Sequence, residues 1–126
     1  LLIQGIREIM EGYEIMMGKE MMLTMAPETA FVQGGQSAYN GVWGAYLPIL
    51  DALRDSIDIL HVQLYNSGSM YGIDGNVYSQ GTADFILAMT EAMIQGFDTD
   101  GGHFEGLPEN KVVVLSFQQT TDVYQF

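Results

Sequence analysis

Cysteine is absent and basic residues are scarce in this 126-residue sequence. Without cysteine there is no disulfide framework, no thiol nucleophile and no thiolate metal site. Four Lys and Arg stand against 16 Asp and Glu, which gives a formal charge of -12. Because binding to nucleic acid or to an anionic membrane surface rests on clustered Lys and Arg, we expect neither partner. No apolar run approaches the roughly 20 residues that span a membrane.

Hydrophobic residue types make up 48 % of the sequence, which is enough to bury a core and excludes an intrinsically disordered chain. The length suits one compact domain or part of a larger one. The sequence begins at Leu1, inside an apolar pattern that no capping residue precedes. We therefore expect a segment cut from the middle of a longer protein.

Apolar residues recur at steps of three and four in three stretches, which predicts amphipathic helices. These stretches are 2–16, 46–57 and 83–95. Thr82 is expected to cap the third helix, and Gly18 and Gly96 are expected to end the first and third. Stretches rich in Gly, Ser, Asn or Asp are expected to be loops, at 34–44, 66–81 and 98–102.

Three shorter stretches predict strands, at 21–26, 59–65 and 111–115. The second alternates between an apolar face and a polar face. Its apolar face holds Leu60, Val62 and Leu64, and its polar face holds His61, Gln63 and Tyr65.

Helices and strands alternate along the chain, which predicts parallel strands joined by right-handed crossovers. Both an open doubly wound sheet and a barrel fit this order. In an open sheet the polar face of 59–65 would have to pack under helices, whereas in a barrel it faces the axis and ends at the active-site mouth. We therefore expect an α/β fold, a partial TIM (β/α)8 barrel with three parallel strands and their helices.

Five segments, in order, resemble bacterial chitinases of glycoside hydrolase family 18. They are LTMAPET at 23–29, WGAYLP at 43–48, VQLYN at 62–66, DGN at 74–76 and QGTADF at 80–85. The likeness runs from about Gly18 to Val114. It implies that the three strands are the fifth to seventh of an eight-stranded barrel, that residues 1–126 are a fragment of one catalytic domain, and that the tail 115–126 departs from the family.

The resemblance also implies a function. The parent protein would be a secreted enzyme that hydrolyses β-1,4 links in chitin or N-acetylglucosamine oligomers, with no cofactor. The catalytic Glu of this family lies in a motif that would precede Leu1, so the isolated segment is expected to be inactive without the remainder of the barrel. A lectin-like relative that binds sugar without hydrolysing it, and a small α/β domain with no sugar role, are the alternatives.

In this family the substrate's own acetamido group attacks the anomeric carbon, so the protein must hold that group. By resemblance, Tyr65 donates its hydroxyl to the acetamido oxygen, and Gln63 and Asn66 hydrogen-bond around the same sugar. The alternative for Tyr65 is a residue of the barrel wall, and for Gln63 a core amide whose hydrogen bonds are satisfied.

Three further residues are candidates for substrate binding. Glu28 follows the first strand at the mouth and would accept hydrogen bonds from sugar hydroxyls, or it is a solvated loop carboxylate. Met25 would lie beneath the sugar, although Met at such a position is more often core. Trp43 is a candidate platform for a sugar ring or a hydrophobic anchor before a helix. The acidic residues around Asp98 fail the spacing of a calcium loop, so no metal is expected.

Overall fold

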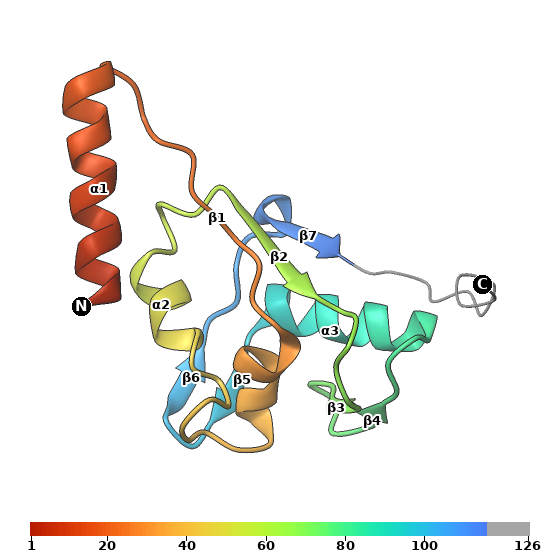
Figure 1. The fold of residues 1–126 in the computed structure, drawn as a ribbon. Coiled ribbons are helices and arrows are strands. Elements are labelled where there is room, and N and C mark those ends of the chain that lie inside the picture. The colour runs from red at the N-terminus through yellow and green to blue at the C-terminus, as the bar shows by residue number, and fades with distance from the viewer. Residues whose placement is uncertain (116–126) are drawn as a thin grey trace, which may run out of the picture.

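The computed structural model describes residues 1–115 (Figure 1). A parallel sheet of three strands has the order β1 (Thr24–Met25), β2 (Ile59–Gln63) and β7 (Val112–Leu115). The expected α/β fold with parallel strands is confirmed. The first strand is shorter than the predicted 21–26. Its pairing with β2 begins at Thr24, opposite Ile59, so residues 21–23 precede the first paired residue. The three strands do not close into a barrel.

The three predicted helices are present, with one different length. They are α1 (Leu2–Met17), α2 (Leu47–Ala52) and α3 (Ala83–Gln95). Gly18 ends α1 in the left-handed conformation with φ of 66°, and the Thr82 hydroxyl accepts the Phe85 N–H at the start of α3, both as predicted. The second helix is shorter than the predicted 46–57 because turns follow Leu53, whose side chain is nevertheless buried.

Two short antiparallel hairpins occupy stretches that the sequence predicted as loops. The first pairs β3 (Met70–Tyr71) with β4 (Val77–Tyr78), and the second pairs β5 (Phe97–Thr99) with β6 (Gly102–Phe104). Strands of two or three residues are too short to show a period of two, so their sequences carry no strand signal. The predicted turn at Asp74 and Gly75 is confirmed as the tip of the first hairpin.

Short 3₁₀ helices fill much of the remaining chain. They are η1 (Thr29–Phe31), η2 (Gln33–Gln36) and η3 (Glu109–Lys111). The first two follow β1 in the chain, and only residues 34–36 of η2 lie within the Gly-rich stretch 34–44 that the sequence assigned to a loop. Gln33 reaches from η2 to α3, where its Nε2 donates to the Met89 carbonyl at 3.0 Å, so η2 and α3 pack against each other.

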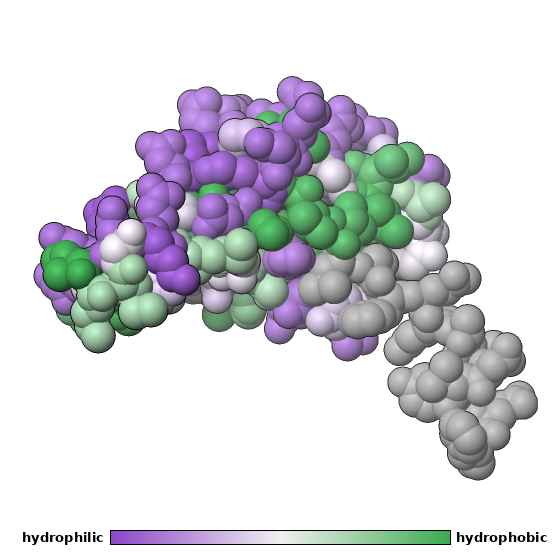
Figure 2. Space-filling model, turned by 90° about the horizontal axis from the view of Figure 1, so that it is seen from above, coloured by the Kyte–Doolittle hydropathy of each residue, from purple (hydrophilic) through white to green (hydrophobic). Residues whose placement is uncertain are grey.

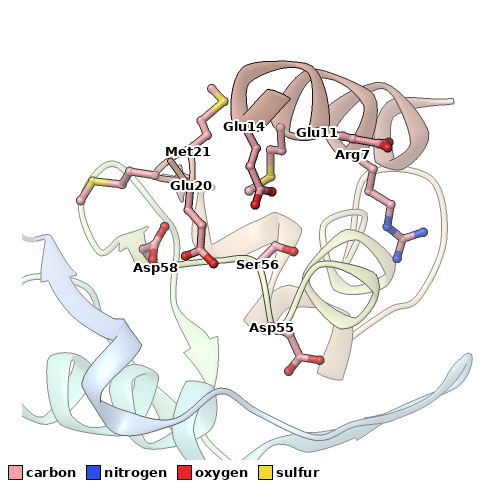
Figure 3. A pocket seen from close by; sticks show the side chains of 10 residues that line it. Arg7, Glu11, Glu14, Glu20, Met21, Asp55, Ser56 and Asp58 are labelled. Carbon is pink, nitrogen blue, oxygen red and sulfur yellow. The ribbon is translucent and has the colours of Figure 1, made fainter. Parts of the chain in front are cut away.

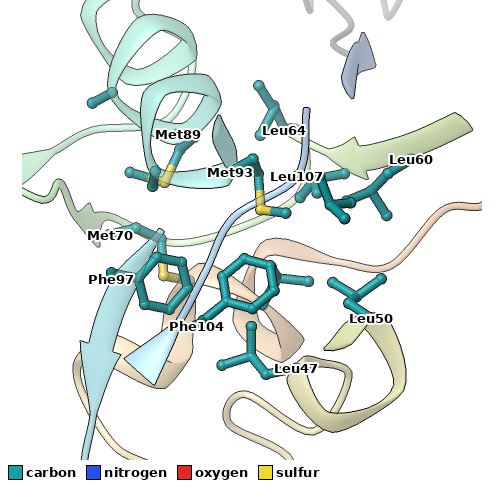
Figure 4. Packing of buried hydrophobic residues seen from close by; sticks show 14 of the residues in the cluster. Leu47, Leu50, Leu60, Leu64, Met70, Met89, Met93, Phe97, Phe104 and Leu107 are labelled. Carbon is teal, nitrogen blue, oxygen red and sulfur yellow. The ribbon is translucent and has the colours of Figure 1, made fainter. Parts of the chain in front are cut away.

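The hydrophobic core lies on one face of the sheet (Figure 4). The apolar face predicted for 59–65 is confirmed, because Leu60, Val62 and Leu64 are each at most 3 % exposed. Side chains of α2, α3 and both hairpins pack against them, among them Leu47, Leu50, Met70, Met89, Met93, Phe97 and Phe104. The opposite face of β2 is only half-buried. The sheet is therefore covered by packed elements on one side.

Helix α1 stands beside this core (Figure 1) and none of its residues is buried. Arg7 ties it to α2 by donating to the Ala52 carbonyl at 2.8 Å. Ile9 and Met16 on the helix are exposed, as is Val113 on β7. Seen from above, the surface carries hydrophobic areas between hydrophilic ones (Figure 2). No helix among residues 1–115 has the length and apolar character needed to cross a bilayer.

Candidate sugar-binding site

The carboxyl ends of β1 and β2 bring Glu28 beside Gln63. The two residues form a parallel bridge that continues the β1–β2 register beyond Met25. Paired residues of neighbouring strands direct their side chains to the same face of a sheet. Glu28 therefore lies on the polar face of β2, opposite the hydrophobic core, and its side chain is exposed. The structure thus brings together two of the residues that the sequence predicted.

Gln63 is held by two hydrogen bonds to the segment that follows β1. Its backbone N–H donates to the Pro27 carbonyl at 2.9 Å, and its side-chain Nε2 donates to the Ala26 carbonyl at 2.9 Å. An amide side chain has two N–H donors and one carbonyl acceptor. One donor therefore fixes the rotamer of Gln63, while its carbonyl oxygen and second N–H belong to the same half-buried face. The bond to Ala26 agrees with the alternative of an amide whose hydrogen bonds are satisfied, and contact of Gln63 with a sugar stays a prediction.

Tyr65 and Asn66 follow β2 directly. Tyr65 is half-buried and lies two residues beyond Gln63, in the bend that follows the strand. Asn66 is exposed and has a φ of 53°, the left-handed conformation that Asn adopts more readily than most residues. Next to it the hydroxyl of Ser67 is buried and has no hydrogen-bond partner among the described residues, a feature that the sequence did not signal. The chain therefore changes direction immediately after the predicted catalytic tyrosine.

Met25 lies on the opposite face from these residues. It pairs with Leu60, whose side chain is fully buried in the core, and Met25 itself is half-buried against the same cluster. The register therefore favours the core role that the sequence left open for Met25 over contact with a sugar.

Trp43 packs against η2, at Gly34. A Cβ added at Gly34 would lie 2.6 Å from Trp43 Cε3, so glycine there makes room for the indole ring. The ring is still 38 % exposed. The predicted anchor before a helix accounts for the packed side of the ring, and the exposed side leaves its use as a platform a prediction.

The β3–β4 hairpin, which follows the candidate site in the chain, is fixed by polar side chains. Tyr78 donates its hydroxyl to Asp74 Oδ2 at 2.7 Å, and Asn76 donates to both carboxylate oxygens. The bond from Tyr78, followed by those from Asn76, lowers the pKa of Asp74 below its usual value. The same bond raises the pKa of Tyr78, because only the protonated phenol can donate.

A large cleft lies at the other end of the strands, between α1 and residues 55–58 (Figure 3). Its walls carry the carboxylates of Glu11, Glu14, Glu20, Asp55 and Asp58. Asp58 also accepts the Leu23 N–H at 2.8 Å, at the point where β1 and β2 begin. Because ligands of parallel α/β sheets bind at the carboxyl ends of the strands, this cleft is not the candidate site.

No group of three potential metal ligands occurs within residues 1–115. Asp98 Oδ1 lies 2.6 Å from His103 Nδ1 across the β5–β6 hairpin, but within the described residues these two side chains have no third potential metal ligand beside them. Asp98 was considered from the sequence as part of a calcium loop. The structure instead places it in a strand ladder opposite His103.

Comparisons with known proteins identify similar chains. No family model matches. Chitinase Chi52 of Paenibacillus xylanexedens is 53 % identical over 100 residues, which cover 79 % of this chain and 18 % of that protein. Chitinase D of Niallia circulans is 51 % identical over 100 residues, with the same coverage. This chain therefore spans about a fifth of the length of the curated relatives it matches.

A solved structure that is similar to this chain is also that of a chitinase. The crystal structure of a family GH18 chitinase from Chromobacterium violaceum superimposes with a TM-score of 0.78 at 38 % identity, covering 90 % of this chain and 31 % of the other. The resemblance that the sequence motifs indicated is thereby confirmed, and over the matched residues this chain is a homologue of the chitinases of glycoside hydrolase family 18.

Proposed function

We propose that this chain is part of a chitinase, an enzyme that hydrolyses the β-1,4 links between N-acetylglucosamine units of chitin. The observation that carries the proposal is the identity of up to 53 %, over 79 % of this chain, to proteins named chitinases. We further propose that the parent protein is secreted and that chitin or its oligomers are its substrates.

The fold supports a place in a (β/α)8 barrel. Packed elements cover one face of the three parallel strands, and the other face carries the half-buried His61 and Gln63. In a barrel the covered face is the outside and the polar face points to the axis. We propose that residues 1–126 form part of one catalytic domain, with β1, β2 and β7 as its fifth to seventh strands. Of the tail 115–126, Leu115 ends β7 and residues 116–126 lie outside the described residues.

The proposed mechanism assigns this chain the wall that binds the acetamido group. As an acid protonates the glycosidic oxygen, the acetamido oxygen attacks the anomeric carbon and gives an oxazolinium ion, which water opens with retention of configuration. Positive charge then develops on the acetamido group, and the Tyr65 hydroxyl holds its oxygen in line. Gln63 and Asn66 bind the same sugar, and Glu28 accepts from its hydroxyls. The catalytic acid lies outside this chain in the proposal.

A substitution of Tyr65 tests this assignment. In the protein that contains this chain, Tyr65→Phe is expected to lower kcat on a chromogenic chitobioside far more than it changes KM, because the hydroxyl acts mainly in the transition state. Tyr13→Phe, on α1, removes a hydroxyl without touching the candidate site and serves as the control. An unchanged kcat with a raised KM would make Tyr65 a ground-state binding residue, and a parent protein that hydrolyses no chitin oligomer would contradict the proposed function.

The isolated chain provides a second test. A general acid contributes on the order of 10²–10⁴ to the rate, so a chain without that acid is expected to show no turnover. Turnover by the purified 126-residue chain that Tyr65→Phe abolishes would show that the acid is present here after all.

A further inference from the structure

A groove of about 510 Å³ lies between the β3–β4 and β5–β6 hairpins, next to η2. Its lining includes Gln36, Tyr71, Ile73, Asp98 and His103. Both hairpins lie at the lower end of the view in Figure 1. A cavity of this size is within the range that holds small ligands in proteins.

The groove combines an exposed ring with hydrogen-bonding groups. Tyr71 is 44 % exposed and Ile73 is 39 % exposed, so apolar surface faces the opening. Asp98, which also lines the groove, has a side chain that is 91 % exposed, and its Oδ1 lies 2.6 Å from His103 Nδ1. Asp98 Oδ2 and the other ring nitrogen of His103 take no part in that contact. An apolar platform faced by a few polar groups is the usual composition of a ligand site.

The walls of the groove are fixed before any ligand arrives. Gln36 Nε2 donates to the Tyr71 carbonyl at 2.9 Å, which ties β3 to η2. Phe97 and Phe104 anchor the other hairpin in the core, with ring centroids 5.3 Å apart. Gly72 leaves space for the Tyr78 ring, since a Cβ there would lie 2.7 Å from it. Walls that do not reorganise lower the entropy cost of binding.

The chemistry of the lining selects a neutral, hydroxyl-rich ligand. No Lys or Arg lines the groove, so a phosphate or carboxylate ligand would find no permanently charged cation there. No group of three metal ligands is present in the described part of the chain, so a metal ion would lack a full set. A sugar ring has an apolar face for the tyrosine and hydroxyls for a carboxylate and an imidazole. We propose that this groove binds an N-acetylglucosamine unit of a chitin chain, an inference that rests on the proposed function for the choice of sugar.

Hydrogen exchange measured by mass spectrometry localises the binding. The probe is N-acetyl-chitotetraose, added to the protein that contains this chain with Tyr65→Phe present so that the sugar survives. Segments 70–78 and 96–104 are expected to exchange at least about fivefold more slowly with the sugar. Tyr71→Ala and Asp98→Ala are each expected to remove that protection. Leu87→Ala, which truncates another exposed apolar side chain, is the control and is expected to keep it.

The possible results separate this inference from the proposed function. Protection confined to residues 63–66, or no protection at all in a protein whose unsubstituted form hydrolyses chitin, overturns the groove and leaves the chitinase proposal intact. Protection at both hairpins in a protein that hydrolyses no chitin supports the groove and contradicts the enzyme. Protection that survives both Tyr71→Ala and Asp98→Ala also overturns the assignment.

Discussion

The hydrogen bond between the Gln63 side chain and the Ala26 carbonyl predicts an unusual pH dependence for the substitution Gln63→Glu. At neutral pH the introduced carboxylate cannot donate to Ala26, and it would stand beside Glu28 in the bridge between the two strands. At acid pH the protonated carboxyl group has an O–H that can donate to the same carbonyl. Relative to the unsubstituted protein, the variant should therefore lose little free energy of unfolding at acid pH and more at neutral pH.

The magnitude follows from two contributions. Loss of the 2.9 Å hydrogen bond removes about 0.5–1.5 kcal/mol and leaves the Ala26 carbonyl facing a carboxylate. A like charge directly opposite Glu28 costs up to about 1 kcal/mol, since Glu28 is exposed and water screens the pair. We expect Gln63→Glu to lower the free energy of unfolding by about 2 kcal/mol at pH 7.

The sign of the pH dependence can be checked directly. The folded state favours the protonated form of the introduced group, so its folded pKa lies above the unfolded value of about 4.3. Its contribution is fully present below that unfolded pKa and is lost as pH rises through the folded pKa. Urea unfolding of variant and wild type should give nearly equal stabilities at pH 4 and diverge by pH 7.

Two controls separate the contributions. Asn40→Asp makes the same chemical change in an exposed loop and should alter stability little at either pH. Combining Gln63→Glu with Glu28→Gln should recover the part due to repulsion but not the lost donor. A pH-independent loss of stability for Gln63→Glu would refute the reasoning, because it would show that the side-chain bond to Ala26 does not govern this position.

Two further substitutions test polar groups elsewhere. Tyr78→Phe should raise the pKa of Asp74 in an NMR titration, because it removes the hydrogen bond that lowers it. In the unsubstituted protein, the contribution of this bond to stability is present above the unfolded carboxyl pKa and is lost as pH falls through the lowered folded pKa of Asp74. The same contribution is lost as pH rises through the raised pKa of Tyr78. Gln33→Met should change the free energy of unfolding by no more than about 1 kcal/mol. The substitution loses the buried hydrogen bond to Met89, but it also removes Gln33 Oε1, a buried oxygen that has no partner among the described residues. A loss above about 2 kcal/mol in urea unfolding would contradict this reasoning.

Much of the fold follows from patterns that the sequence carries in full. The alternation in 59–65 predicted which side chains of β2 are buried, and the apolar steps of α1 and α3 predicted their lengths to within a residue or two. The two hairpins could not be predicted, because their pairing depends on contacts with η2 and α3 rather than on their own short sequences. Tertiary packing decides such segments.

The candidate site was predictable where strand geometry determines it. Gln63 was expected at a strand end on the polar face, and the structure places it there. The face of Met25 was not predictable, because an apolar run shows no alternation, and only its pairing with Leu60 resolves it. Whether Tyr65, Asn66, Glu28 and Trp43 contact substrate stays a prediction.

The central position of β2 explains why one strand bears both core and site. Leu60 and Val62 are locked in the core, and the residues between and after them must then project from the other face. Gln63 gains a second constraint from its two hydrogen bonds to the residues that follow β1, whereas Asn66 lies beyond the last ladder pair, in a bend. In the proposed sugar site, the position of the Gln63 side chain should therefore be more tightly fixed than that of Asn66. A core substitution such as Val62→Ala, which changes none of the candidate sugar-binding residues, is expected to shift the position of Gln63 more than that of the others. The reason is that Val62 and Gln63 are neighbours in one strand and share its register.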